Sequence, residues 1–216
     1  MRKIRGILYS IRQRFYFRLN GKKLFYLIDD ALKENNIFYW LDFGTLLGAV
    51  REHGFIKGDY DMDLSIFYKD HIYVKEALES KGIKMLLYSF IEGRNAVFHK
   101  YKYKGIVFDI FFYELNDERD TLTGYSFYSI KNNSPKNKKQ IRGVKKLSMP
   151  YSGFKEILFL GKTVSIPSDY KQYLSNIYGE NYMTPDPKFS HIKNPNRENF
   201  IKQYNPDEIT GVTRII

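Results

Sequence analysis

Three aspartates alternate with apolar side chains over residues 59–64, which read Asp-Tyr-Asp-Met-Asp-Leu. Successive side chains of a β-strand point to opposite faces, so the pattern predicts a strand with carboxylates on one face and a core on the other. On a helix the same spacing would place Asp61 opposite Asp59 and Asp63. We expect a strand over about 61–68, and an exposed acidic strand edge or an Asp-rich turn is the alternative.

A fourth aspartate, Asp109, lies in the most apolar segment of the chain, 105–112, which reads Gly-Ile-Val-Phe-Asp-Ile-Phe-Phe. An ionised carboxylate buried in such a segment costs several kcal/mol unless it is paired or bound to a metal. A lysine or backbone donors could satisfy Asp109. Alternatively, Asp109 joins Asp61 and Asp63 as the third metal ligand and is a candidate base for an acceptor hydroxyl.

Crowded carboxylates favour a cation between them. Two carboxylates about 5 Å apart repel by roughly 1–3 kcal/mol at effective dielectric constants of about 80 to 20. Hard divalent ions prefer oxygen ligands, and Mg²⁺ is usually shared between one or two carboxylates and substrate phosphates. The sequence therefore indicates Mg²⁺, or Mn²⁺, at a catalytic and metal-binding set formed by Asp61, Asp63 and Asp109.

Gly44 and Thr45 precede the acidic segment at an expected turn between a strand and a helix. A glycine there lets backbone N–H groups approach a phosphate, and the N-terminus of the following helix favours anions. Thr45 can add a hydroxyl donor. Arg51 and Lys57 lie between the two segments and could neutralise phosphate charge, although both could equally be solvated surface cations. Together these four residues are candidates for binding a phosphate or nucleotide.

Hydrophobic periodicity predicts an α+β fold in which a mixed β-sheet is flanked by helices. The chain has 216 residues, 43% of them hydrophobic, which is enough for the core of one domain. The expected strands are 37–41, 61–68, 83–90, a hairpin of 95–103 with 106–113 around Lys104-Gly105, and a hairpin of 154–160 with 163–166. Helices are expected over 21–35 and 46–51, after Asp70, and after Ser168.

The first 28 residues carry eight Lys or Arg and no acidic residue. Ile4, Leu8, Ile11, Phe15 and Leu19 recur at helical spacing, which predicts a basic amphipathic helix over 1–20 ahead of a single catalytic domain over 21–216. Such a helix suits an anionic membrane surface. The alternative is a helix that packs on the domain with its basic face in water.

A second basic segment, 131–146, holds seven Lys or Arg and no acid, with Pro, Asn and Gly throughout. We expect a mobile loop, either one that grips a polyanionic acceptor or simply a solvated charge run.

Composition limits the classes of partner and the kinds of catalytic site that the chain can have. The net charge of +11 favours an anionic partner: nucleic acid, a membrane surface or phosphorylated small molecules. The chain has no cysteine, which excludes disulfides and thiolate sites. There is no Walker A, G-x-G-x-x-G or G-x-S-x-G motif. The lack of cysteine fits a reduced cytosolic compartment, so we expect a cytoplasmic protein. A secretory signal and a membrane-spanning run are also not expected.

Two blocks of the sequence resemble the LicD family, which includes the fukutin-related proteins and lies within the nucleotidyltransferase-fold superfamily. Residues 40–51 read Trp-Leu-Asp-Phe-Gly-Thr-Leu-Leu-Gly-Ala-Val-Arg, and residues 54–63 read Gly-Phe-Ile-Lys-Gly-Asp-Tyr-Asp-Met-Asp. The later pairs Ile166-Pro167, Tyr173-Leu174 and Tyr178-Gly179, followed by Tyr182-Met183-Thr184-Pro185, are similar to the family's closing segment. Lys57 and Gly58 replace the usual Pro-Trp, a departure that bears on donor or acceptor preference.

The resemblance implies a nucleotidyltransferase-like fold and transfer of a phospho-alcohol group, such as phosphocholine or a polyol phosphate, from a CDP-activated donor to a glycan hydroxyl, with release of CMP. It implies a glycan or lipid-linked glycan acceptor of the cell surface, as in lipopolysaccharide, capsule or teichoic acid modification, and a place in the cytoplasm or at the inner face of the membrane. A nucleotide-sugar glycosyltransferase with an Asp-x-Asp metal site is one alternative. A non-enzymatic nucleic-acid-binding protein is another.

Overall fold

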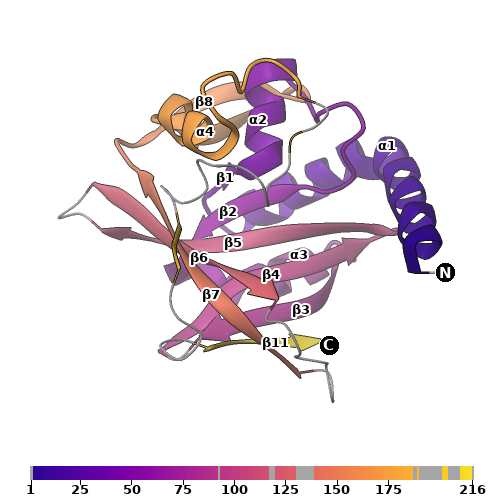
Figure 1. Cartoon of the computed structure of the whole chain (residues 1–216), viewed down its shortest axis with the longest axis horizontal. Coiled ribbons are helices and arrows are strands. Elements are labelled where there is room, and N and C mark those ends of the chain that lie inside the picture. Colours follow the sequence, from indigo (N-terminus) through magenta and orange to yellow (C-terminus); the bar gives the residue numbers. More distant parts are fainter. Residues whose placement is uncertain are drawn as a thin grey trace.

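A mixed β-sheet organises the chain (Figure 1). The structure is a computed structural model and describes residues 2–91, 93–116, 120–129, 139–186, 189, 201–203 and 210–215. Its helices are α1 (Arg2–Glu34), α2 (Phe43–Glu52), α3 (His71–Glu79) and α4 (Tyr170–Tyr178), with a 3-10 turn η1 (Tyr68–Asp70). Its strands are β1 (Tyr39–Leu41), β2 (Asp63–Phe67), β3 (Lys84–Ile91), β4 (Arg94–Tyr103), β5 (Ile106–Asn116), β6 (Thr121–Ser129), β7 (Lys139–Pro150), β8 (Phe154–Phe159), β9 (Lys162–Pro167), β10 (Ile201–Gln203) and β11 (Thr210–Ile215).

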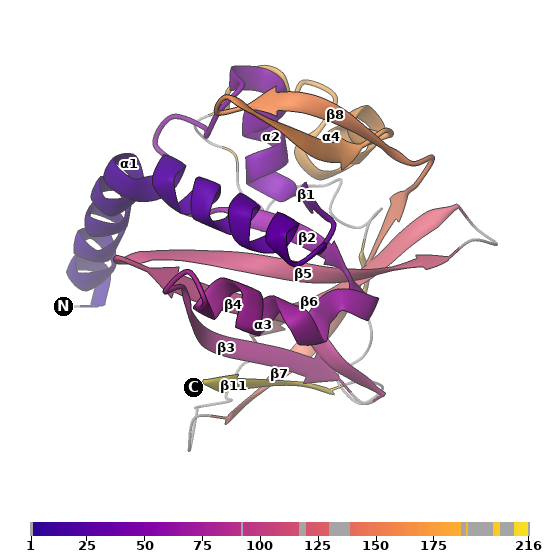
Figure 2. The same ribbon diagram turned by 180° about the vertical axis from the view of Figure 1, so that it is seen from behind.

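Within the described residues the strands form one sheet in the order β10-β7-β11-β3-β4-β5-β2-β1-β9-β8, and β6 pairs with β5 and β7. The β2–β5 and β1–β9 pairs are parallel, whereas the remaining pairs are antiparallel. Helices α1 and α3 lie across one side of this sheet, as Figure 2 shows. Helices α2 and α4 and the β8–β9 hairpin lie together beyond β1 and β2 (Figure 1). The α+β class with a helix-flanked mixed sheet is confirmed.

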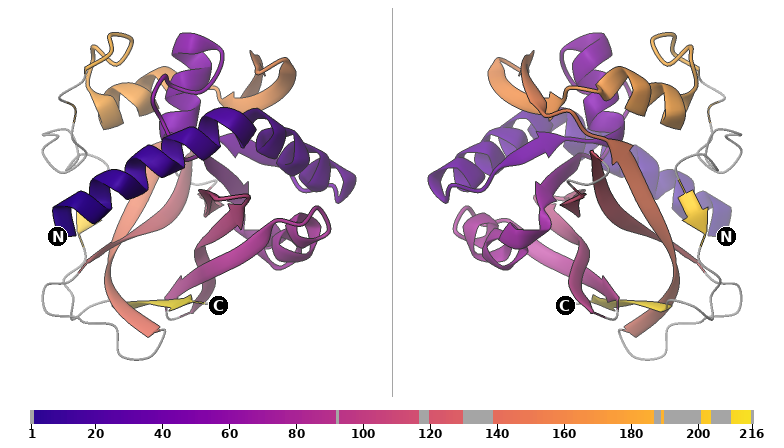
Figure 3. Two further views of the ribbon diagram at one scale, coloured as in Figure 1. Left: turned by 90° about the vertical axis from the view of Figure 1, so that its right-hand side faces the viewer. Right: turned by 90° about the vertical axis from the view of Figure 1, so that its left-hand side faces the viewer.

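The N-terminal segment forms one helix, so the expectation of two helices that separate near residue 20 is wrong. A single glycine inside a helix costs only about 1 kcal/mol, which tertiary packing readily offsets. At Gly21 an added Cβ would lie 3.4 Å from the Phe55 ring and 3.5 Å from the Phe17 ring. Figure 3 shows that α1 changes direction partway along its length. The boundary expected at residue 20 falls inside α1, and the division into a helix and a catalytic domain stays a prediction.

The strand expected over 61–68 begins only at Asp63, so the continuous alternation predicted for residues 59–62 is wrong. Residues 59–62 form a loop that enters β2, and the Met62 carbonyl of this loop accepts a hydrogen bond from the Asp109 N–H of β5 at 3.0 Å. The hairpin around Lys104-Gly105 is confirmed, and both turn residues have positive φ (43° and 87°), as a two-residue turn of type I′ requires.

The basic segment 131–146 is not one loop. Residues 139–146 belong to β7, which pairs with β6 over most of its length, so the expectation of a mobile loop is wrong for this part. Backbone pairing within a sheet decides the conformation here despite the charge of the side chains. Residues 131–138 lie outside the described residues.

Large aromatic side chains fill the core between the sheet and its helices. Trp40 of β1 is fully buried, and so are Phe108 and Phe112 of β5 and Phe25 of α1. These rings place β1, β5 and α1 on one continuous core. In the described part of the chain, none of the helices is both long enough and apolar enough to span a membrane.

Buried His99 makes the stability of the fold dependent on pH. The imidazole packs against the Phe112 ring at 4.7 Å between ring centroids, and Nδ1 lies 3.2 Å from the Tyr101 hydroxyl. Burial, with a smaller contribution from His71, lowers the pKa of His99 to about 3. Between about pH 6.5 and pH 3 the unfolded chain therefore binds a proton that the folded chain does not, and this contribution to stability falls as the pH falls.

We predict that His99→Gln flattens the dependence of the unfolding free energy on pH between about pH 4 and 6 by up to about 1.4 kcal/mol per pH unit. Urea unfolding at several pH values measures the slope for both proteins. The matched control is His53→Asn, which replaces an exposed histidine of positive φ by a residue that tolerates this conformation. Equal slopes for wild type and His99→Gln would contradict the prediction.

Candidate active site

The parallel pairing of β2 with β5 sets Asp63 directly beside Asp109. The pairing continues into the loop before β2, where the Asp109 N–H donates to the Met62 carbonyl at 3.0 Å. In a parallel pair, neighbouring residues in register present their side chains on the same face. The convergence of these two expected catalytic carboxylates is therefore built into the sheet.

Asp63 sits at the centre of a group of carboxylates. Burial, then the negative charges of Asp61, Asp109, Asp42 and Asp59, raise the pKa of Asp63 well above its ordinary value. Asp61 acts on both Asp63 and Asp109, so the loop residue joins the two strand residues electrostatically even though it is not in a strand. We call Asp42, Asp59, Asp61, Asp63 and Asp109 the acidic cluster.

Asp109 has a lysine partner, one of the alternatives that the sequence left open. Lys100 Nζ lies 2.7 Å from both carboxylate oxygens of Asp109 and donates a hydrogen bond to Oδ2. The two residues face each other across the antiparallel β4–β5 pair. Burial still raises the pKa of Asp109 despite the ammonium group. The ammonium group of Lys100, on the neighbouring strand β4, thus places one positive charge beside several carboxylates.

Asp42 was not among the expected site residues. It is fully buried at the N-cap of α2, where its carboxylate accepts hydrogen bonds from the Phe43 N–H (2.7 Å), the Ser65 hydroxyl (2.6 Å) and the Tyr173 hydroxyl. Burial raises its pKa, against the opposing effect of these donors. Asp42 therefore connects α2, β2 and α4. An acidic residue ahead of a glycine-containing helix is the sequence signal for such a cap.

Thr45 holds α2 against the start of β2. Its buried Oγ1 accepts a hydrogen bond from the Asp63 N–H at 2.9 Å. Gly44 leaves room beside the acidic cluster, because a Cβ at this residue would lie 3.5 Å from Asp59 Oδ2 and 3.9 Å from Asp63 Oδ2. The structure thus makes Thr45 a residue that positions Asp63, and it makes Gly44 the point where the backbone comes close to two carboxylates.

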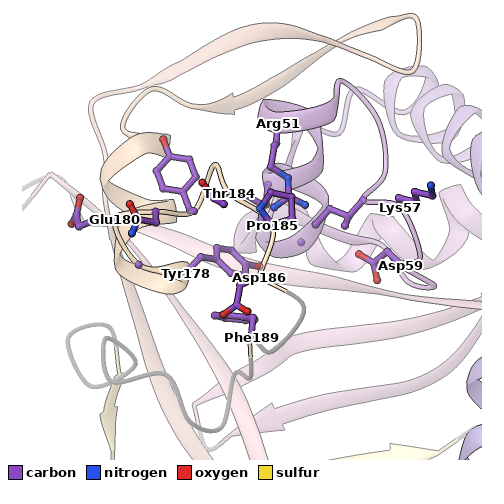
Figure 4. A pocket seen from close by; sticks show the side chains of 15 residues that line it. Arg51, Lys57, Asp59, Tyr178, Glu180, Thr184, Pro185, Asp186 and Phe189 are labelled. Carbon is purple, nitrogen blue, oxygen red and sulfur yellow. The ribbon is translucent and has the colours of Figure 1, made fainter.

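A pocket of about 820 Å³ lies next to the acidic cluster and is lined by Gly44, Arg51, Lys57 and Asp59 together with residues from the end of α4 onward (Figure 4). Arg51 also pairs with Glu52 (2.9 Å). Lys57 is exposed at the rim. Three of the four expected phosphate-binding residues therefore share one cavity.

The opposite wall of the pocket was missed as a site. It contains Tyr178, Tyr182 and Phe189 as aromatic residues and Glu180 and Asp186 as acidic ones. Burial and the charges of Asp63, Asp42, Asp59 and Asp61 raise the pKa of Tyr178 well above its ordinary value, so this tyrosine lies near the acidic cluster. The sequence signal for this wall was the Tyr178-Gly179 pair together with the run Tyr182-Met183-Thr184-Pro185.

The acidic cluster fits a hard divalent cation in its chemistry. Its donors are carboxylate oxygens. Burial and then mutual repulsion raise the pKa of Asp63, and a bound cation would relieve that repulsion. In the part of the chain that the structure describes, however, no three His, Cys, Asp or Glu side chains are grouped so that they could hold a metal ion.

The chain belongs to the family described as LicD/FKTN/FKRP, nucleotidyltransferase domain, which matches residues 36–169. The match includes Asp61, Asp63 and Asp109 together with Gly44, Thr45, Arg51 and Lys57, whereas the pocket wall after α4 lies beyond it. The nucleotidyltransferase-like fold and the resemblance that the two sequence blocks indicated are both confirmed.

Individual relatives match over shorter stretches. An uncharacterized protein of Rickettsia prowazekii is 44% identical over 68 residues, which cover 29% of this chain and 26% of that protein. The ribitol-5-phosphate transferase FKTN of Mus musculus is 40% identical over 55 residues, which cover 26% of this chain and 12% of that protein. The chain thus spans about a quarter or less of the length of these relatives. Among solved structures, the antibiotic-resistance factor ANT(2'')-Ia is similar with a TM-score of 0.44 and 14% identity, over 84% of this chain and 80% of that chain.

We predict that Thr45→Val destabilises the fold by about 1–3 kcal/mol, because it leaves the Asp63 N–H without its acceptor in a buried position. Thr45→Ser keeps the hydroxyl and is the matched control, with a smaller loss from the missing methyl group. Urea unfolding of the three proteins measures the difference. A loss from Thr45→Ser as large as that from Thr45→Val would show that the hydrogen bond is not what Thr45 contributes.

Proposed function

We propose that the chain is a metal-dependent transferase that moves a phospho-alcohol group, of the phosphocholine or polyol-phosphate type, from a CDP-activated donor to a glycan hydroxyl and releases CMP. The observation that carries the proposal is the pairing of Asp63 with Asp109 beside a pocket that Gly44 and Arg51 line. Membership of the LicD family and the similarity to a ribitol-5-phosphate transferase support this class of reaction.

The pocket suits a nucleotide-activated donor in size and in lining. Its volume of about 820 Å³ lies within the range of small-molecule sites, which is about 300–1,000 Å³. Arg51 offers a guanidinium group to a diphosphate. Tyr178, Tyr182 and Phe189 offer aromatic faces to a base or to a quaternary ammonium group. The Phe43 N–H at the start of α2 already donates to the Asp42 carboxylate, so it is not available to a phosphate. The main contribution of Gly44 is therefore that it lets the backbone come close to the ligand.

Asp61, Asp63 and Asp109 would hold Mg²⁺ or Mn²⁺. Mg²⁺ commonly takes one or two carboxylates and completes its shell with water and substrate phosphates, so the protein need not supply three ligands to one ion. When bound, the ion offsets the charge of the diphosphate and of the departing CMP.

The chain's own residues align the reactants and handle the proton. The acceptor oxygen forms a bond to the phosphorus that carries the alcohol, and the bond from that phosphorus to the CMP oxygen breaks. Asp109 is the candidate base for the hydroxyl proton, because burial raises its pKa, and Lys100 fixes its orientation. No covalent intermediate with the protein is required.

A panel of donors tests the proposed reaction against the glycosyltransferase alternative. We predict that the chain with Mg²⁺ or Mn²⁺ releases CMP from CDP-choline or a CDP-polyol in the presence of a glycan acceptor, and that excess EDTA stops the release. Chromatography of the nucleotide products gives the measurement. Release of UDP from UDP-sugars instead would favour the glycosyltransferase. Tight, salt-dependent duplex binding without turnover would favour the nucleic-acid binder.

We predict that Asp63→Asn lowers turnover by at least about a hundredfold, since losing even an indirect partner of a metal ligand costs about 10–100-fold. Without added metal, the same variant should be at least as stable as wild type, because a neutral amide removes repulsion within the acidic cluster. Turnover assays and thermal unfolding in EDTA provide the two measurements. Asp70→Asn, on η1 and outside both the pocket and the acidic cluster, is the matched control. Wild-type turnover in Asp63→Asn would refute the proposed site.

A further inference from the structure

Helix α1 has one face that packs on the domain along residues 10–24. Gln13, Phe17 and Gly21 are buried on this face. The Phe17 ring contacts Phe55 at 4.5 Å between centroids, and Phe55 contacts Phe159 of β8 at 5.3 Å. Because a helix advances about 100° per residue, these buried positions define the inner side of this part of α1.

The outer side of the same turns is apolar. Ile11 is 57% exposed, Phe15 is 60% exposed and Leu19 is 62% exposed. Spaced four residues apart, the three side chains form a stripe roughly opposite Gln13 and Phe17. The stripe predicted from sequence is thus not the face that packs on the domain. A contiguous group of large apolar side chains in water indicates an interaction surface rather than scattered surface residues.

Cations flank this stripe on both sides. Arg12, Arg14, Arg18, Lys22 and Lys23 are exposed, and no acidic residue occurs between Ser10 and Ile28. The Arg12 guanidinium lies over the Tyr16 ring at 5.4 Å, and that of Arg14 lies over the Tyr60 ring at 5.9 Å. We call the stripe with these five cations the α1 outer surface.

We propose that the α1 outer surface docks on an anionic lipid membrane, with Ile11, Phe15 and Leu19 in the interfacial region and the flanking cations against lipid headgroups. A helix with an apolar stripe between Lys and Arg side chains has the charge complementarity for this occupant. A second copy of the chain would bring two surfaces of five cations each together. Nucleic acid would leave the apolar stripe unused.

Docking in this way bears on the proposed active site without depending on it. Phe55 and Tyr60, which contact the inner side of α1 and the Arg14 side chain, belong to the segment between α2 and β2. This segment also carries Lys57 at the pocket rim and the clustered residues Asp59 and Asp61. A membrane-bound α1 would therefore hold this rim of the pocket near the lipid surface.

Vesicle flotation of the full chain tests the docking. We expect the wild type to float with phosphatidylcholine vesicles that contain phosphatidylserine, to lose binding as salt is raised, and to bind pure phosphatidylcholine vesicles weakly. The triple variant Ile11→Ser, Phe15→Ser, Leu19→Ser should partition about tenfold or more weakly into the anionic vesicles. The matched control replaces three exposed apolar residues elsewhere by serine (Ile72, Tyr73 and Leu158) and should bind as the wild type does.

Equal flotation of the wild type and the stripe variant, or no binding of wild type to anionic vesicles, would overturn the proposal. Sedimentation without lipid tests whether a second copy of the chain occupies the surface instead. If the wild type forms a dimer, the stripe variant does not, and neither binds vesicles, the surface is a dimer interface. Release of CMP with a water-soluble acceptor should be unchanged in the stripe variant. A failed docking test therefore leaves the proposed reaction intact, and a failed reaction leaves the docking test valid.

Discussion

The pairing of β2 with β5 is the constraint on which the rest of the site depends. It sets Asp63 beside Asp109 while the alternate residues of the same strands, such as Leu64, Ile110 and Phe112, are fully buried. The carboxylates cannot move apart without taking these apolar side chains out of the core, because strand register fixes both faces together. Hydrophobic burial thus holds like charges close to one another, and the core supplies the free energy that their repulsion costs.

Two kinds of carboxylate coexist within this constraint. Asp42 is surrounded by donors from Phe43, Ser65 and Tyr173, and it connects α2, β2 and α4 as a structural residue. The pKa of Asp63 is instead raised, chiefly by burial and then by other carboxylates. Asp63 lies close to Gly44, which lines the pocket. Environment rather than residue type therefore separates the carboxylate that stabilises the fold from the one that we propose for the chemistry. The Tyr173 hydroxyl also joins the late sequence block to the early one, because it donates a hydrogen bond to Asp42.

Sequence periodicity was sufficient to predict strands that pair with their neighbours along the chain. The β4–β5 hairpin followed from its two-residue turn, and its register even contains the Lys100–Asp109 pair, since each residue is the fourth from the turn. Non-local contacts could not be obtained in this way. Residues 59–62 alternate as a strand would, yet they lie in a loop, because in the described structure the pairing with β5 reaches only as far as the Met62 carbonyl. The packed side of α1 could not be predicted from the sequence either. Gln13, which is polar, and Gly21, which has no side chain, occupy the buried face, whereas Phe15 and Leu19 are exposed to water.

The continuity of α1 links its outer surface to the centre of the domain. Toward its C-terminal end, Asp29 is buried and bonded to the Tyr39 hydroxyl and the Lys162 ammonium group, each at 2.6 Å, which fixes the helix on β1 and on the β8–β9 hairpin. Earlier in the helix, Phe17 packs on Phe55 in the segment that leads to the acidic cluster. A helix held at both points cannot tilt on its own, since either contact would have to break. Any ligand of its outer face therefore orients the whole domain, and with it the mouth of the pocket.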